Sequence, residues 1–363
     1  MSRFTIHGTV DRMLSSDPDF RFMALSDLHG ELQRDGFLAS SDEQRKLCSS
    51  LRGLLQDSSS EVQGLAMRCL PALVTKVNPS FACDIVDSLV KHLLDRSTVG
   101  VGQRSDDMSR LGAKSFRDVA SLGLKSIMIE LSPGKPVSQA IAGILLPQLL
   151  NGANRVDHDD VQLDCLELLH ETLLRHSESL MSAHDDIQKQ LLMVSLATRP
   201  MVRKRAITCI SDLCVSCSRP IFDEICAFLK DALSRRAPKD MNQTRTAVLT
   251  LSAIAKTCGY RLAEHLPDLI VPLMNLFEEN EMKDDEELME NFLHALDSLV
   301  SRCGHRMSPY IDRLVTLFLT ASTYDPNYAF AGEVDNDGVC DEYDATMDYQ
   351  DDEEEEEEEE DYS

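Results

Sequence analysis

The sequence predicts an all-α fold, an α-solenoid of about seven and a half antiparallel helix pairs. The first observation is a pattern that recurs along the chain, with anchors 42, 57, 42, 41, 41 and 45 positions apart: Phe20, Val62, Val119, Val161, Val202, Gln243 and Leu288. The second is that apolar or small residues recur at fixed distances after each anchor, and the third is that Pro or Asp marks the expected helix starts. A repeat of about 40 residues is typical of solenoids, whose units stack in one dimension.

Each repeat contains one helix with an apolar stripe, because apolar or small residues lie four, five, eight and twelve positions after the anchor. Only Gln243 interrupts the pattern. The fourth position is small in six of the seven repeats, which lets a neighbouring helix approach closely: Ala24, Ala66, Gly123, Cys165, Ala206, Ala247 and, as the exception, Phe292. The twelfth position is filled by Leu32, Val74, Leu131, Leu173, Cys214, Ala255 and Val300.

A further apolar helix precedes each stripe, so every unit is a helix pair. The expected helix starts carry residues that favour a helix N-terminus: Pro18, Pro79, Pro136, Asp159, Pro200 and Pro220. Two helices per unit favour a HEAT repeat over an armadillo repeat. The longest gap contains the polar, Gly-rich segment 97–115, which we expect to form a mobile loop between paired helices.

The chain divides into a predicted solenoid, 1–322, and a predicted disordered acidic tail, 323–363. Residues 331–363 hold 18 acidic side chains and no Lys or Arg, which leaves 44 acidic and 36 basic side chains elsewhere, a net charge of −8. A segment with the composition of the tail cannot bury enough apolar surface to fold. The mildly acidic body argues against nucleic-acid binding, which needs clustered Lys and Arg.

The composition of the N-terminus and the spacing of the cysteines predict where the protein is located. The first twenty residues are charged and polar where a signal peptide needs an apolar run, and the most apolar segment, AIAGILLPQLL, is too short to span a bilayer. Eleven irregularly spaced cysteines are typical of reduced, buried thiols. We therefore expect no membrane contact and a location in the cytoplasm, the nucleus or both.

Two groups of residues invite a metal-binding interpretation. Cys214 and Cys217 have metal-ligand spacing, but a structural zinc site needs a second such pair. Cys209 and Cys226 flank them, yet Cys214 lies in the apolar stripe, so buried structural thiols are favoured. The acidic groups at 157–160 and 184–186 precede helical stripes, where carboxylates usually serve as caps.

Catalysis is not predicted. His170 and His176 are six residues apart, which places them on different faces of a helix, whereas two zinc ligands of a metalloprotease are four apart. No phosphate-binding Gly-rich loop, nucleophile elbow or kinase motif is present in the sequence. We expect no enzyme activity, no cofactor and no metal.

The main basic patch of the sequence is Arg203, Lys204 and Arg205, with Arg245 one repeat later. All four lie beside core positions of the second helices, which usually line the concave face of a solenoid. A solvated helix face is one interpretation. The other is that these four residues bind acidic patches on a wrapped protein partner.

The segment YIDRLVTLFLT is predicted to be the first helix of an eighth unit. Ile311, Leu314, Val315, Phe318 and Leu319 fall at helical spacing on one face. Burying such a side chain stabilises a protein by roughly 1.5–3 kcal/mol, so an uncovered face is unfavourable. The helix rests on the seventh unit with a partly exposed face, or a second polypeptide docks on that face and completes the stack.

Three segments together resemble a known family. FRFMALSDL (20–28), RDVASLGLKSI (117–127) and TYDPNY (323–328) followed by acid resemble, in order and spacing, segments of the Cand family of cullin-associated, neddylation-dissociated proteins. The resemblance runs through essentially the whole chain. It implies a HEAT solenoid that wraps an unneddylated cullin–RING ubiquitin ligase scaffold. It also implies that the N-terminal repeats hold the cullin C-terminal region and the RING subunit, and cover the lysine that neddylation modifies.

The sequence departs from the family pattern at its end, because it stops inside what resembles the acidic loop of the family. We therefore expect a non-catalytic regulator whose partners are unneddylated cullin, its RING subunit and a second HEAT-repeat chain, with no nucleic acid. The alternative is an adaptor similar to nuclear-transport receptors, which are also acidic HEAT solenoids with an acidic loop. A histone chaperone acting through the tail is a third interpretation.

Overall fold

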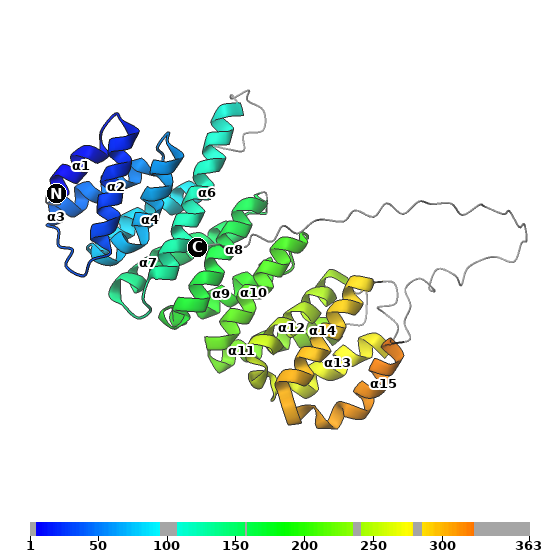
Figure 1. Ribbon diagram of the computed structural model, residues 1–363. Helices are drawn as coiled ribbons and strands as arrows, with labels where there is room; N and C mark the ends of the chain where they lie inside the picture. The colour runs from blue at the N-terminus through cyan, green and yellow to red at the C-terminus, as the bar shows by residue number, and fades with distance from the viewer. Residues whose placement is uncertain (1–4, 95–106, 157, 235–240, 279–284, 323–363) are drawn as a thin grey trace, which may run out of the picture. The chain divides into compact units, whose positions relative to one another are not determined.

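The computed structural model describes residues 5–94, 107–156, 158–234, 241–278 and 285–322, with the backbone alone at 107–115, 159 and 241. This part of the chain is built from α-helices and two 3₁₀ segments and contains no strand. Figure 1 shows helix pairs following one another from α1 to α15. The predicted all-α repeat architecture is therefore confirmed.

The helices alternate between two roles. First helices contact the first helices of adjacent pairs: α1 (Ile6–Met13), α3 (Ser41–Leu54), α5 (Pro79–Leu93), α7 (Pro136–Ala153), α9 (His184–Val194), α11 (Arg219–Ser234) and α13 (Leu266–Glu278). Second helices contact one another in the same way: α2 (Pro18–Leu32), α4 (Ser60–Lys76), α6 (Asp107–Glu130), α8 (Asp159–His176), α10 (Pro200–Ser216), α12 (Met241–Leu262) and α14 (Glu286–Cys303). The 3₁₀ segments η1 (Ser177–Ala183) and η2 (Gly304–Tyr310) lead into α9 and α15 (Ile311–Ala321).

The predicted helix starts are confirmed. Four of the prolines occupy the first helical position, where the missing N–H group has no intrahelical partner to lose, and Pro220 is the second residue of α11. Side-chain caps complete several starts. The carboxylate of Asp17 accepts a hydrogen bond from the backbone N–H of Asp19 at 2.9 Å, and Ser40 and Glu43 form a reciprocal capping box.

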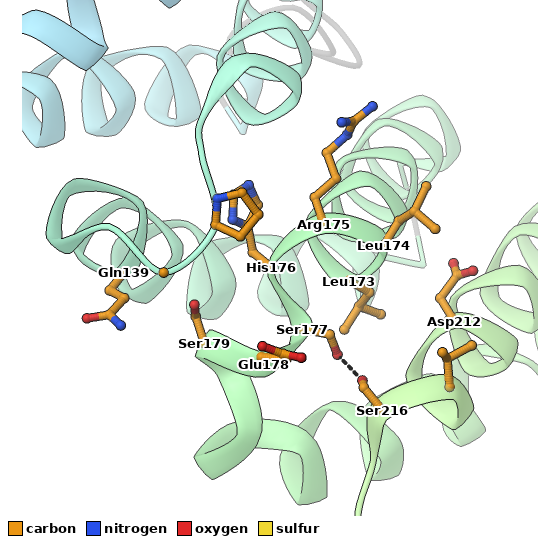
Figure 2. A pocket seen from close by; sticks show the side chains of 13 residues that line it. Gln139, Leu173, Leu174, Arg175, His176, Ser177, Glu178, Ser179, Asp212 and Ser216 are labelled. Atoms are coloured by element: carbon orange, nitrogen blue, oxygen red, sulfur yellow. Dashed lines mark hydrogen bonds between the residues drawn. The ribbon is translucent and has the colours of Figure 1, made fainter.

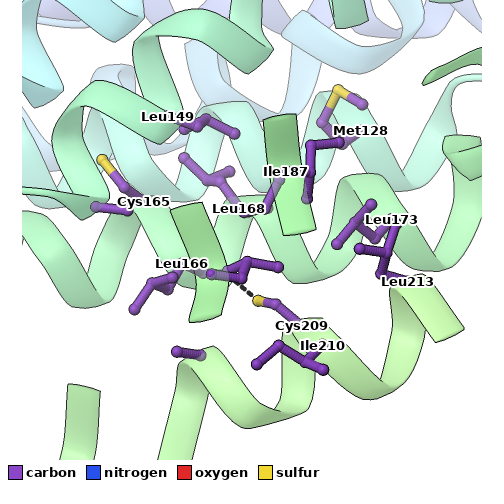
Figure 3. Close-up of a cluster of buried hydrophobic side chains, with 14 of the residues drawn as sticks. Met128, Leu149, Cys165, Leu166, Leu168, Leu173, Ile187, Cys209, Ile210 and Leu213 are labelled. Carbon is purple, nitrogen blue, oxygen red and sulfur yellow. Dashed lines mark hydrogen bonds between the residues drawn. The ribbon is translucent and has the colours of Figure 1, made fainter. Parts of the chain in front are cut away.

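The core runs between the two layers of helices and is built from the repeating stripe. All six small residues at the fourth position are buried, and so is Phe292, which stacks on Phe277 with ring centroids 5.7 Å apart. Figure 3 shows one stretch of this core, where residues of α6 to α10 interlock. There the Cys209 thiol donates to the Leu166 carbonyl oxygen at 3.3 Å, which satisfies a polar group in an apolar setting.

Small residues allow close approaches between helices, which the sequence predicts for Gly123 but not for Gly152. At Gly123 an added Cβ atom would lie 3.3 Å from a methyl carbon of Leu70, so α6 sits tightly on α4. At Gly152 the same atom would lie 2.3 Å from the sulfur of Cys165, which brings α7 against α8. Both contacts depend on the absence of a side chain.

Three expectations about the solenoid need correction. Residues 107–115, expected in a mobile loop, form the beginning of α6, and residues 97–106 lie outside the described part. Phe20 and Val300, expected in the core, are exposed. In α14 Leu299 is buried in place of its neighbour Val300. The helix repeats every 3.6 residues, so a position at a fixed whole-number distance from the anchor does not always face the core. The predicted tail, 323–363, also lies outside the described residues.

Candidate protein-binding surfaces

Exposed apolar side chains are concentrated on the second helices. In the part of the chain that the structure describes, first helices before α15 contribute only Met193 and Val271 to the large exposed apolar residues. The second helices contribute ten: Phe20, Phe22, Met23, Leu122, Ile129, Leu174, Met201, Val215, Tyr260 and Val300. Single exposed apolar side chains are ordinary, but their concentration on one layer of helices makes that layer the candidate surface for binding another protein. The face formed by these ten residues is called the second-helix face below.

Arg203, which the sequence places in a partner-binding patch, is buried. Its side chain is only 3% exposed, and Nη1 donates to the carbonyl oxygens of Ala197 and Thr198, each at 3.2 Å. The guanidinium thereby supplies donors to the turn that follows α9. Arg203 is therefore a structural residue, and its assignment to an outward contact is wrong.

The other three predicted basic residues form ion pairs between helices. Arg205 of α10 lies 2.6 Å from Glu167 of α8, and Arg245 of α12 lies 2.5 Å from Asp285, the N-cap of α14. Lys204 is more than half exposed and lies 3.5 Å from Glu287, also exposed. Exposed pairs of this kind are weak. Lys204 is thus the member of the predicted set that remains available to a partner.

A series of polar contacts joins successive second helices and was not predicted from the sequence. Arg117 of α6 contacts Asp160 at 3.3 Å and Asp164 at 3.7 Å on α8. His170 Nδ1 on α8 lies 2.6 Å from Asp212 Oδ2 on α10, and this hydrogen bond raises the pKa of His170. The partners are 42 to 47 residues apart, one repeat, and that spacing is the signal that could have revealed them.

The last described helix, α15, divides its apolar residues between two faces. Leu314 and Leu317 are buried, and Arg313 anchors the helix to α13 through Glu278 at 2.6 Å. Assigning Leu314 to an open docking face is therefore wrong, because it faces the seventh unit. Ile311 is 50% exposed, Val315 52%, Phe318 37% and Leu319 65%, at the spacing of one helical stripe. The stripe Ile311, Val315 and Phe318 is called the α15 stripe below.

The cysteines of the described residues are not arranged as a metal site. Every cysteine in the described part is a free thiol, and this part contains no group of three or more His, Cys, Asp or Glu residues placed to hold a metal ion. A hydrogen bond from Cys214, together with the positive charge of Arg261, lowers the pKa of Cys217 to about 7. Burial raises the pKa of Cys165 to about 12 and that of Cys69 likewise to about 12.

A pocket of about 540 Å³ lies where the C-terminal ends of α8 and α10 meet η1 (Figure 2). Several of its polar groups make structural contacts, although the buried His176 Nδ1 has no hydrogen-bond partner. His176 is buried with Nε2 3.2 Å from the Met128 carbonyl oxygen, and Ser177 bonds to Ser216. His184 Nε2 lies 3.1 Å from Ser177 Oγ but also 2.9 Å from the Ser177 carbonyl oxygen. The carbonyl contact requires Nε2 to carry a proton, so His184 is not poised as a general base toward Ser177.

Among the described helices, none combines the length and apolar character that crossing a membrane requires.

Comparison with known proteins identifies the family. The chain is 30% identical over 334 residues to cullin-associated NEDD8-dissociated protein 1 of Dictyostelium discoideum, and 32% identical over 359 residues to the protein of that name in Drosophila melanogaster. It is 34% identical over 329 residues to cullin-associated NEDD8-dissociated protein 2 of Mus musculus. These alignments cover 91%, 96% and 90% of this chain.

The chain belongs to the Cand family. It corresponds to an N-terminal part of the family's proteins and spans about a quarter of the length of these relatives, 25 to 26%. No protein-family model matches the chain.

The solved structures that resemble the Cand chain establish its fold. A structure of Kap95p with RanGDP matches 89% of this chain and 41% of its own length, with a TM-score of 0.53 and 16% identity. A structure of importin beta matches 88% of this chain and 40% of its own length, with a TM-score of 0.52 and 17% identity. At these identities the likeness concerns the fold alone, and it confirms the predicted HEAT-type solenoid.

Proposed function

We propose that the chain is a non-catalytic regulator of cullin–RING ubiquitin ligases. It binds the C-terminal cullin and RING end of the scaffold that lacks NEDD8 and masks the lysine to which NEDD8 is attached. The observation that carries this proposal is 30 to 34% identity over about nine tenths of the chain to proteins named as cullin-associated and NEDD8-dissociated.

The mechanism that fits this fold is steric. The second-helix face offers apolar side chains on successive repeats, so a partner can contact many of them at once. A stable interface of this type buries more than about 1,000 Å² and has an apolar centre with a polar rim. NEDD8 attached within the covered region would compete with the chain for the same space.

The α15 stripe supports a second contact. Its three apolar side chains are exposed while Leu314 and Leu317 pack inward, so the stripe can receive the next helix of a solenoid. The relatives extend well beyond the region that this chain matches. We place a second HEAT-repeat chain, corresponding to the C-terminal part of the family, on this stripe.

The likeness to karyopherin structures keeps one other candidate function open, that of a nuclear-transport adaptor. The two functions make opposite predictions for the Ran GTPase. An adaptor of the transport class would bind Ran in its GTP form, whereas the proposed cullin regulator would not. A cullin regulator of this kind would act in both the nucleus and the cytoplasm.

The proposal is tested by a pull-down with purified cullin–RING scaffold in two forms, unmodified and carrying NEDD8. We expect recovery of the unmodified form, at least tenfold more than of the modified form. RanGTP serves as a third bait in the same experiment. Equal recovery of both cullin forms would refute the masking mechanism, and capture of RanGTP in their place would favour the transport adaptor.

A further inference from the structure

A shallow groove of about 240 Å³ crosses three successive second helices, α10, α12 and α14. Its floor is apolar and is made by Ile207, Leu249 and Ala253, which are buried or half-buried. Its rim carries the exposed basic side chains Lys204, Lys256 and His294. These six residues define what is called the three-helix groove below.

The ionisable side chains that line the three-helix groove are basic, whereas the protein as a whole is acidic. Three basic side chains line it and no carboxylate does, whereas the complete chain carries a formal net charge of −26. Within the described residues no ion pair engages Lys256. Lys204 and His294 have carboxylate neighbours at 3.5 and 3.8 Å, Glu287 and Glu290, and all four side chains are well exposed. Such contacts exchange readily for a ligand carboxylate.

The apolar floor restricts the kind of anion that fits. A phosphate group or a nucleic-acid backbone gains nothing from Ile207 and Leu249, and the net charge of the chain repels an extended polyanion. An acidic side chain next to an apolar one satisfies both parts of the groove. Its carboxylate can lie between two ammonium groups while its neighbour covers the floor.

We propose that the three-helix groove binds a segment of a protein partner in which an Asp or Glu residue stands next to a large apolar residue. The proposal rests on the proposed function in one respect, namely that the second-helix face is the partner-binding face. It replaces the buried or paired arginines of the predicted basic patch with Lys204, Lys256 and His294 as the groups that meet acid on the partner.

The probe is the capped dipeptide acetyl-Leu-Glu-amide, titrated into the full chain with isotope-labelled methyl groups. We expect the methyl signals of Ile207, Leu249 and Ala253 to move in a saturable way. Acetyl-Leu-Gln-amide, which lacks the carboxylate, should bind at least threefold more weakly. Inorganic phosphate should leave these methyl signals in place.

Variants provide the matched comparison. Lys204→Gln and Lys256→Gln should each weaken the Leu-Glu probe by about threefold, the size expected for one exposed charge contact. Glu287→Gln removes the carboxylate that competes with the probe for Lys204, so this variant should bind the Leu-Glu probe more tightly. Lys230→Gln on the first helix α11, where Lys230 pairs with Asp268 at 2.7 Å, is the control and should have no effect.

Equal binding of the Glu and Gln probes would overturn the proposal, as would phosphate moving the same methyl signals or Lys230→Gln acting like Lys256→Gln. These titrations contain no cullin. A failure of the groove is therefore distinguishable from a failure of the proposed function, which the pull-down alone decides.

Discussion

At the scale of single residues, one glycine fixes the approach of α12 to α14. A Cβ atom added at Gly259 would lie 2.6 Å from Cβ of Arg302, an atom held close to the backbone of α14. The preceding residue, Cys258, already departs from helical geometry with φ −141° and ψ 41°. The two helices can therefore separate only at the expense of the contacts around them.

We expect Gly259→Ala to lower the free energy of unfolding by about 1–3 kcal/mol, because the new methyl group overlaps α14. Gly64→Ala in α4 is the control, since nothing lies within 4 Å of its added Cβ atom. That variant should be neutral or more stable by up to about 1 kcal/mol, as Ala favours a helix over Gly. Urea denaturation of both variants measures the difference, and equal effects would contradict the packing argument.

A second residue-scale prediction concerns pH. The hydrogen bond with Asp212 raises the pKa of His170 above its usual 6.5, so the pair stabilises the fold fully below pH 6.5. That contribution declines as the pH rises through the raised pKa. Asp212→Asn should therefore reduce the free energy of unfolding by about 1 kcal/mol more at pH 5.5 than at pH 9. Glu290→Gln, beside the exposed His294, is the control, and a pH-independent loss for Asp212→Asn would contradict the assignment.

At the scale of elements, α15 combines a structural face with an exposed one. Leu314 and Leu317 pack inward, and Arg313 binds Glu278 and Asn275 of α13. The α15 stripe, about a quarter of a turn away, makes no comparable contribution to the core. The two faces can thus be altered separately.

The triple variant Ile311→Ser, Val315→Ser and Phe318→Ser should have a free energy of unfolding within about 1 kcal/mol of that of the native chain, because substitutions at exposed positions have small effects. It should lose binding of a C-terminal Cand-family HEAT chain in a pull-down. Leu317→Ala is the matched comparison. It should cost about 2–3 kcal/mol of stability through a cavity, and it should keep the binding at a temperature where it is folded. Retained binding by the triple variant would remove the α15 stripe from the interface.

At the scale of the whole molecule, neighbouring pairs are joined both by a continuous apolar core and by ion pairs one repeat apart. In a stack of this kind each unit is stabilised mainly by its neighbours. Arg205 and Arg245, which look like part of a binding patch in the sequence, form two of these ion pairs between neighbouring helix pairs. Under the proposed function, a partner would meet a surface of apolar side chains and a few lysines without strong ion pairs, and many modest contacts would supply the affinity.

The sequence by itself determined the repeat, the two helices of each unit, their proline-marked starts and most of the buried columns. It could do so because helix periodicity and terminal residues act locally, within a few turns of one helix. Its resemblance to the Cand family is likewise confirmed by comparison.

Only the tertiary structure decided which side chains remain available. Arg203 and Leu314 are buried, Arg245 forms an ion pair with the N-cap residue of α14, and Phe20 is exposed. The three-helix groove also appeared only when α10, α12 and α14 were placed together. The exposure and pairing of these side chains depend on the packing of helices one or two repeats away and, for Arg203, on the adjacent turn. A pattern read along one helix contains no information about that packing.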